Sequence, residues 1–312
     1  MEILRTPDDR FESLPDFPFE PRWAEIPIDA DAPGDGTLRV HYVDEGPSDA
    51  APILLLHGEP SWAYLYRFVI PPLVEAGHRV VVPDQVGFGR SDKPASTDDY
   101  TYARHVAWMS SLVFDHLDLT DVTFFGQDWG GLVGLRLVAA QPERFARVAI
   151  ANTGLPTGDP PPGDAFLRWQ RYSQEAPSLD IGALVDGATL RDLTDAERAA
   201  YDAPFPDDSF KAGARIWPSL VVTSPDGPGA ADNRAAWEVL KAWEKPFLCC
   251  FSDGDPLTGG GDRPFRRLVP GARDQPHLTL AGGGHFLQED VGPELADVLD
   301  RFVAGTLGGS GA

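Results

Sequence analysis

A carboxylate stands at a predicted sharp turn in the stretch Gly126-Gln127-Asp128-Trp129-Gly130. An apolar run precedes it and a helical pattern follows, so the stretch predicts a strand, a tight elbow with Asp128 at its apex, and a helix. Many hydrolases carry serine at such an apex, in the pattern Gly-x-Ser-x-Gly. Aspartate differs because its carboxylate, with an ordinary pKa of about 4, is already anionic at pH 7. It can therefore attack an sp³ carbon directly.

Two further residues complete a catalytic set along the chain. Asp255 lies in "SDGDP" and His285 follows three glycines in "GGGHF". The order Asp128, Asp255, His285 is the nucleophile–acid–histidine order of α/β-hydrolases. All three follow predicted strands, and sites in α/β sheets form at the carboxyl ends of strands. We expect His285 to act as a general base that Asp255 orients.

Apolar runs that alternate with helical patterns predict the sheet that must position these residues. Short buried runs of this kind are typical of parallel strands. The strand signals lie in 38–46, 51–60, 78–92, 121–131, 147–154, 245–256 and 277–286, with helices expected at 101–118 and 234–244.

The sheet pattern is interrupted in the middle of the chain. A Pro/Gly-rich segment at 155–164 leaves the sheet, and helical patterns without a strong strand follow to about residue 220. The sequence predicts an α/β core in two parts, residues 1–154 and 229–312, with a helical cap at 155–228 inserted between them.

The chain resembles the haloalkane dehalogenases of the α/β-hydrolase superfamily. The matching motifs are "LRTPDDRF", "LLLHGEPSWAYLYR", "VVPDQVGFGRSDKP", "GQDWGG", "AYDAPFPD" and "GGGHFLQED". They are spread over nearly the whole chain. The resemblance implies the α/β-hydrolase fold, a mostly parallel central sheet flanked by helices with an inserted helical cap.

The same resemblance implies hydrolysis of haloalkanes to a primary alcohol and halide through an alkyl ester on Asp128. Negative charge develops on the departing halide, so donors placed around it in advance lower the barrier. An indole N–H is an uncharged donor on an apolar body. Trp129 is therefore expected to bind the halide.

A second halide donor is expected from the cap. The subfamily with two halide-binding tryptophans carries Phe-x-x-Trp on an early cap helix, and Phe166 to Trp169 match it. We therefore expect Trp169 in this role and Trp217 in packing. Other dehalogenase subfamilies use an asparagine after His-Gly, where this chain has Glu59, which favours the two-tryptophan arrangement.

Hydrolysis of the ester requires two N–H donors for the oxyanion. The superfamily takes one from the backbone of the residue after the nucleophile, here Trp129, and one from the loop after His-Gly, here Glu59. The Glu59 side chain could hold the water or serve the structure alone; the sequence leaves both open.

Three alternative functions share features with this sequence. Epoxide hydrolases share the Asp/His/Asp set and use two cap tyrosines, for which Tyr172 and Tyr201 are candidates, but Trp129 has no purpose in that chemistry. Fluoroacetate dehalogenases place arginine beside the nucleophile, which this chain does not. A non-catalytic relative would usually lack a catalytic residue, and all three are present.

Composition limits the partners. The chain of 312 residues has a net charge of −22, which disfavours nucleic acid, anionic membranes and anionic substrates and favours a small neutral haloalkane. Adjacent Cys249 and Cys250 predict a buried strand without a disulfide. With no signal peptide or membrane span in view, we expect a cytoplasmic protein, and a monomer. No motif implies a cofactor or a metal site.

Overall fold

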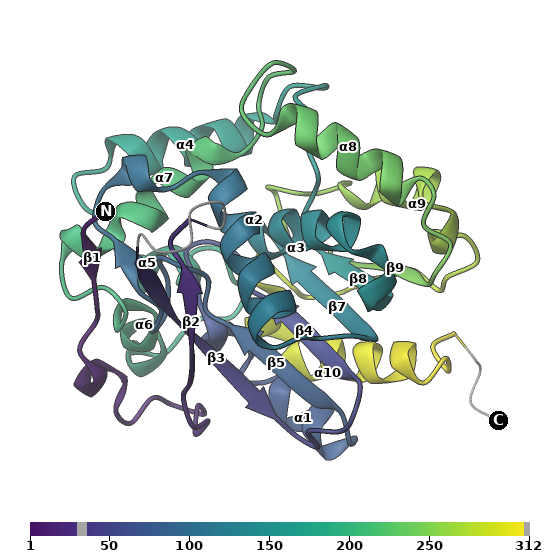
Figure 1. The fold of residues 1–312 in the computed structure, drawn as a ribbon, viewed down its shortest axis with the longest axis horizontal. Helices are drawn as coiled ribbons and strands as arrows, with labels where there is room; N and C mark the ends of the chain where they lie inside the picture. The colour runs from purple at the N-terminus through teal and green to yellow at the C-terminus, as the bar shows by residue number, and fades with distance from the viewer. Residues whose placement is uncertain (30–35, 309–312) are drawn as a thin grey trace.

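An eight-stranded sheet forms the centre of the protein (Figure 1). The structure is a computed structural model that describes residues 1–29 and 36–308. The strand order is β10-β9-β8-β7-β4-β5-β3-β2, parallel from β10 to β5, with β3 antiparallel to both β5 and β2. The strands are β2 (Arg22–Pro27), β3 (Thr37–Glu45), β4 (Pro52–Leu56), β5 (Arg79–Pro83), β7 (Val122–Gln127), β8 (Phe145–Ala151), β9 (Phe247–Ser252) and β10 (Leu278–Leu280). The predicted mostly parallel sheet is confirmed.

The central strands are apolar because both faces of the sheet are covered. Every residue of β4 and of β7 is buried, and β9 is buried up to its last residue. Cys249 and Cys250 lie within β9 as free thiols, as predicted. Outside this sheet, β1 (Ile3–Leu4) pairs with β6 (Lys93–Pro94) as a separate antiparallel ribbon.

Helices cover the two faces of the sheet. On one face α1 (Ile70–Glu75) packs against α10 (Leu287–Val303). On the other, α2 (Tyr102–Ser110) and α8 (Ala230–Leu240) both pack against α3 (Trp129–Ala140), as Figure 1 shows. A π-helical segment, Ser111–His116, continues α2, and α9 (Asp262–Leu268) follows β9. The helix predicted at 234–244 begins and ends four residues later than α8 does, because the chain turns after Leu240 before entering β9.

Residues 155–228, all of them described, contain helices and no strand. In Figure 1 these helices gather together beside the edge of the sheet. Helix α4 (Asp164–Glu175) packs on α7 (Ala212–Leu220), and α5 (Ile181–Asp186) packs on α6 (Asp195–Asp202). Thr194 and Glu197 form a reciprocal capping box at the start of α6. Among the described residues of the whole chain, none of the helices has the length and apolar character needed to span a bilayer.

Candidate active site

Asp128 occupies a strained elbow between β7 and α3. Its φ of +51° and ψ of −125° are rarely adopted by residues with side chains, and such strain is typical of functional positions. The backbone is held from both sides, since Asp128 N–H donates to Asn152 O at 3.0 Å and its carbonyl accepts from Thr153 Oγ1 at 2.7 Å. A Cβ on Gly130 would lie 1.9 Å from Leu56 O, so only glycine lets α3 approach β4 this closely.

The loop after β4 presents a backbone donor to this carboxylate. The N–H of Glu59 donates to Asp128 Oδ1 at 2.8 Å. Buried His57 holds the loop: its Nδ1–H donates to Gly58 O at 2.9 Å, and its Nε2 accepts from Gln85 N–H at 3.0 Å. Both ring nitrogens are used in structural bonds, and burial lowers the pKa of His57. His57 therefore shapes the loop.

The structure brings His285 and Asp255 to the same place. His285 Nε2 lies 3.6 Å from Asp128 Oδ2, and its Nδ1 lies 3.1 Å from Asp255 Oδ2. The remaining capacity of Asp255 is filled by the N–H of Leu257 at 2.8 Å and by the hydroxyl of Thr258. The predicted nucleophile, base and acid thus form one contiguous row.

Opposite charges in this row shift the pKa values in opposite directions. Burial alone would lower the pKa of His285, but Asp255 and Asp128 outweigh it and raise the pKa to about 10. Burial alone would raise the pKa of Asp255, but His285 and the bonds from Thr258 and Leu257 hold it at about 2. In this resting arrangement the imidazole carries a proton between two carboxylates.

Asn152 supports the histidine loop, and sequence reasoning missed it. Its Nδ2 lies within hydrogen-bond distance of Ser252 Oγ, Gly284 O and His285 O, at 2.8, 2.9 and 3.0 Å. Its Oδ1 accepts from Ser252 N–H at 3.0 Å. Asn152 follows β8 directly, so its place at the end of a predicted strand was the signal that could have identified it.

The two tryptophans Trp129 and Trp217 pack together beside the elbow. Their ring centroids are 4.7 Å apart, with an angle of 36° between the planes. The indole N–H of Trp217 is already engaged, because it donates to His105 Nε2 at 2.5 Å. Burial, with a smaller contribution from His57, keeps the pKa of His105 well below its ordinary value, so the ring stays neutral and can accept. Trp217 is therefore held as a buried packing residue with its donor occupied.

Trp169 lies on α4 and its indole reaches Glu59. The carboxyl group of Glu59 is buried beside Asp128, and burial and the Asp128 charge raise its pKa well above the ordinary value. The charge of His285 and the nearby indole of Trp169 oppose that rise. Trp169 is half-buried, and the Glu59 carboxyl group that its indole approaches lies beside the nucleophile.

A cleft of about 880 Å³ reaches Asp128 from the surface. Apolar side chains from the core, the segment after β8, α4 and the segment after α7 line much of it: Leu132, Leu155, Phe166 and Val222. Charged side chains line it as well: Asp159, Arg234, Glu238, Lys241 and Arg267. The apolar side chains suit a small neutral molecule.

The cap tyrosines considered for epoxide opening lie elsewhere. The hydroxyl of Tyr201 is buried and donates to Glu289. Tyr172 is 48% exposed on α4, stacked beside Trp169. Neither residue lines the cleft that reaches Asp128, and Trp129 and Trp169 do not line it either; of the predicted site residues only Asp128 does.

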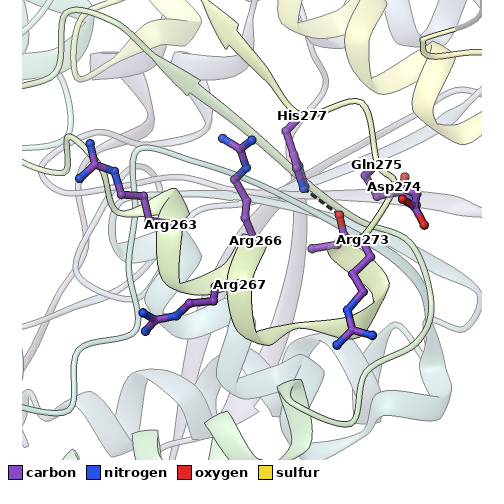
Figure 2. A pocket seen from close by; sticks show the side chains of 8 residues that line it. Arg263, Arg266, Arg267, Arg273, Asp274, Gln275 and His277 are labelled. Atoms are coloured by element: carbon purple, nitrogen blue, oxygen red, sulfur yellow. Dashed lines mark hydrogen bonds between the residues drawn. The ribbon is translucent and has the colours of Figure 1, made fainter.

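A second cavity, of about 510 Å³, lies against α9 and is lined by arginines (Figure 2). The guanidinium groups of Arg263, Arg266 and Arg267 point in different directions and do not converge. His277 uses both ring nitrogens internally, donating to Ala272 O at 2.8 Å and accepting from Cys249 N–H at 3.0 Å. None of the predicted site residues lines this cavity, whereas Asp128 lines the first cleft.

Comparison with known proteins gives the family. A family model described as alpha/beta hydrolase fold matches residues 51–224. A haloalkane dehalogenase from Psychrobacter cryohalolentis is 57% identical over 303 residues, which are 97% of this chain and 98% of that protein. The chain belongs to the haloalkane dehalogenase family.

Other dehalogenases agree with this assignment. A haloalkane dehalogenase from Mycolicibacterium paratuberculosis is 51% identical over 297 residues, 95% of this chain and 97% of that protein. The tetrameric structure of the haloalkane dehalogenase DpaA from Paraglaciecola agarilytica has a TM-score of 0.86 and 33% identity, and the match covers 95% of this chain and 97% of DpaA. The predicted α/β-hydrolase fold, the dehalogenase resemblance and the prediction of a hydrolase acting on carbon–halide bonds are confirmed.

Proposed function

We propose that the protein hydrolyses haloalkanes to alcohol and halide through a covalent alkyl ester on Asp128. The observation that carries this proposal is that the two oxygens of the Asp128 carboxylate have different partners. Oδ1 accepts from the N–H of Glu59 at 2.8 Å, and Oδ2 faces His285 Nε2 at 3.6 Å. One oxygen is thus held for an oxyanion, and the other is available for attack.

In the first step Asp128 Oδ2 attacks the halogen-bearing carbon. A carbon–oxygen bond forms while the carbon–halogen bond breaks, and the halide leaves with the electron pair. The attack needs no base, because the carboxylate is already anionic. His285 is not required for proton transfer in this step.

The leaving halide is stabilised by the indole N–H groups of Trp129 and Trp169. Among the described residues, none accepts a hydrogen bond from Nε1 of Trp129, and the indole of Trp169 approaches the Glu59 carboxyl group beside Asp128. Trp217 is excluded by its bond to His105. This is the two-tryptophan arrangement, in which preorganised donors stabilise the charge that develops on the halogen.

In the second step water hydrolyses the ester. His285 takes a proton from water, and the oxygen attacks Cγ of Asp128, which places negative charge on Oδ1 beside the N–H groups of Glu59 and Trp129. Collapse expels the alkoxide, which takes the proton from His285 and leaves as the alcohol. The regenerated carboxyl group loses a proton to solvent.

The electrostatic interaction between Asp128 and His285 links the two steps. The charge of Asp128 is one of the groups that raise the pKa of His285 to about 10 against the effect of burial. Ester formation removes that charge, so the pKa of His285 falls toward the range in which the ring is a free base. The histidine becomes a base when the ester that needs it has formed.

The cleft and the charge point to the substrate class. We propose that residues 155–228 form the cap that lines the cleft together with the core parts 1–154 and 229–312. The apolar side chains that line the cleft and the net charge of −22 favour a small neutral haloalkane. Cytoplasmic location and a monomeric state stay predictions; DpaA, the structural relative, is tetrameric.

Epoxide hydrolysis is the weaker candidate. Ring opening needs two acids at the epoxide oxygen, but the Tyr201 hydroxyl is committed to Glu289 and Tyr172 is 48% exposed. Halide release from a panel of chloro-, bromo- and iodoalkanes, with styrene oxide as a control, tests the proposal. We expect halide release and little diol; diol without halide would support the alternative.

A further inference from the structure

The catalytic histidine loop is fastened to the cap by one carboxylate, that of Asp290 in the first turn of α10. Its Oδ2 accepts from the N–H of Gly284 at 2.7 Å, one residue before His285. Its Oδ1 accepts from the N–H groups of Leu190 and Arg191, at 2.9 and 2.8 Å, in the segment between α5 and α6. One side chain thus joins two backbone segments that are about ninety residues apart in the sequence.

The same two segments also touch directly. The N–H of His285 donates to Ala188 O at 2.8 Å. A Cβ on Gly284 would lie 2.6 Å from Ala188 O and 3.1 Å from Thr189 Cα, so the glycine permits this close approach. The cap segment therefore lies against the backbone of the catalytic base.

Glu289, the residue before Asp290, makes a second connection, between the core and the cap. Glu289 is buried and binds Arg67 of the core, with Nη1–Oε1 at 2.5 Å, and Arg191 of the cap, with Nη2–Oε2 at 2.5 Å. Arg191 also donates from Nε to the Glu289 carbonyl at 2.9 Å. These ion pairs hold the start of α10 in place and thereby fix the position of Asp290.

The loop needs such support because it is intrinsically pliable. Three consecutive glycines, Gly282 to Gly284, precede His285, and Gly282 has a φ of +80°. Glycine imposes the weakest conformational restriction of any residue. Contacts from outside the loop therefore position the imidazole. Asp255 contacts the ring, Gln127 and Asn152 donate to the His285 carbonyl, and Asp290 and Ala188 bind backbone N–H groups of the loop.

We propose that Asp290 is a positioning residue for the hydrolytic half of the reaction, acting by locking the His285 loop to the cap. The inference rests on the proposed function, in which His285 serves only the hydrolysis of the ester. A carboxylate suits the position because two acceptor oxygens meet three backbone N–H groups; an amide offers only one acceptor oxygen and would turn donors toward donors. Misplacement of a catalytic group by 1 Å can cost about 10²-fold in rate.

The test separates the two half-reactions in Asp290→Asn. With a short bromoalkane, kcat/KM reports alkylation of Asp128, and kcat reports hydrolysis once that step is limiting. We expect kcat/KM within about twofold of wild type and kcat lowered roughly 10- to 100-fold. A burst of about one bromide per enzyme and alkylated Asp128 in the mass spectrum should accompany the loss. Glu294→Gln, an exposed acid on the same helix, is the matched control and should change neither constant.

Asp290→Glu guards against a folding failure of the amide variant, because it keeps both oxygens and the charge and moves them by one methylene group. It should show the same selective loss at smaller size. An equal loss of both constants, or an unchanged kcat, would overturn the assignment. His285→Gln is the reference: if it accumulates ester and the Asp290 variants do not, only this inference fails, whereas absence of ester in His285→Gln itself would remove the proposed function.

Discussion

The core and the cap hold their parts of the site by different means. Core groups are fixed by backbone geometry: Asp128 by a strained elbow, and Glu59 N–H by a loop locked through His57. Cap groups are fixed by side-chain contacts, and its two tryptophans differ sharply. Trp217 is fully buried with its N–H bound to His105, while half-buried Trp169 reaches the Glu59 carboxyl group. Changes in the core should therefore remove a chemical step, and changes in the cap should tune one.

The largest effect is expected from the core, in Asp128→Ala. Loss of the nucleophile should lower halide release by more than about 10⁴-fold, the scale seen when a catalytic nucleophile is removed. The fold should persist, because the elbow is held by backbone bonds to Asn152 and Thr153 rather than by the carboxylate. Halide release and thermal melting measure the two parts, and retention of activity would refute the nucleophile assignment.

The variants Trp169→Phe and Trp217→Phe test the difference between the two cap tryptophans. Phenylalanine keeps the aromatic bulk and removes the N–H, so Trp169→Phe should lower kcat for chloroalkanes by roughly 10²- to 10³-fold. The loss should be smaller for bromo- and iodoalkanes, since better leaving groups depend less on the donors. Trp217→Phe should change activity far less. Reversal of the two results would move the second halide donor to Trp217.

Coupling within the core site should appear in the pH dependence of stability. The folded pKa of His285 is raised to about 10, so its stabilisation is fully present below the unfolded value of about 6.5 and is lost as the pH rises through 10. Between these values the free energy of unfolding should fall with rising pH by up to about 1.4 kcal/mol per unit. Chemical denaturation at several pH values should show this slope in wild type and a reduced slope in His285→Gln. Equal slopes would mean that the histidine is not held as a cation.

The smallest effect is expected at Glu59→Gln. Burial and the charge of Asp128 raise the pKa of Glu59 well above its ordinary value, which favours the neutral form of the carboxyl group, and the amide of glutamine is neutral as well. The backbone N–H of Glu59, the donor to Asp128, is unchanged by the substitution. We expect less than about a tenfold change in kcat/KM, equivalent to about 1.4 kcal/mol. A larger loss would show that the ionised side chain takes part, for example by holding the hydrolytic water.

The core strands and the residues at their ends could be predicted from the sequence, because buried apolar runs and turn residues are local signals. The elbow, Asp255 and His285 were found in this way, and the structure brings them together. Asn152, Glu289 and Asp290 were missed because their importance lies in partners that are distant in sequence. Glu289 and Asp290 both stand in the first turn of a helix, and only the folded chain shows them bound to the cap.

The account depends most directly on an alkyl ester at Asp128. His285→Gln removes the base but leaves the nucleophile and the halide donors in place, so a bromoalkane should still alkylate the protein. Mass spectrometry of the intact variant and of its peptides should show one alkyl group, on Asp128, with about one bromide released per enzyme. An unmodified variant that still binds the substrate would contradict a covalent ester at Asp128.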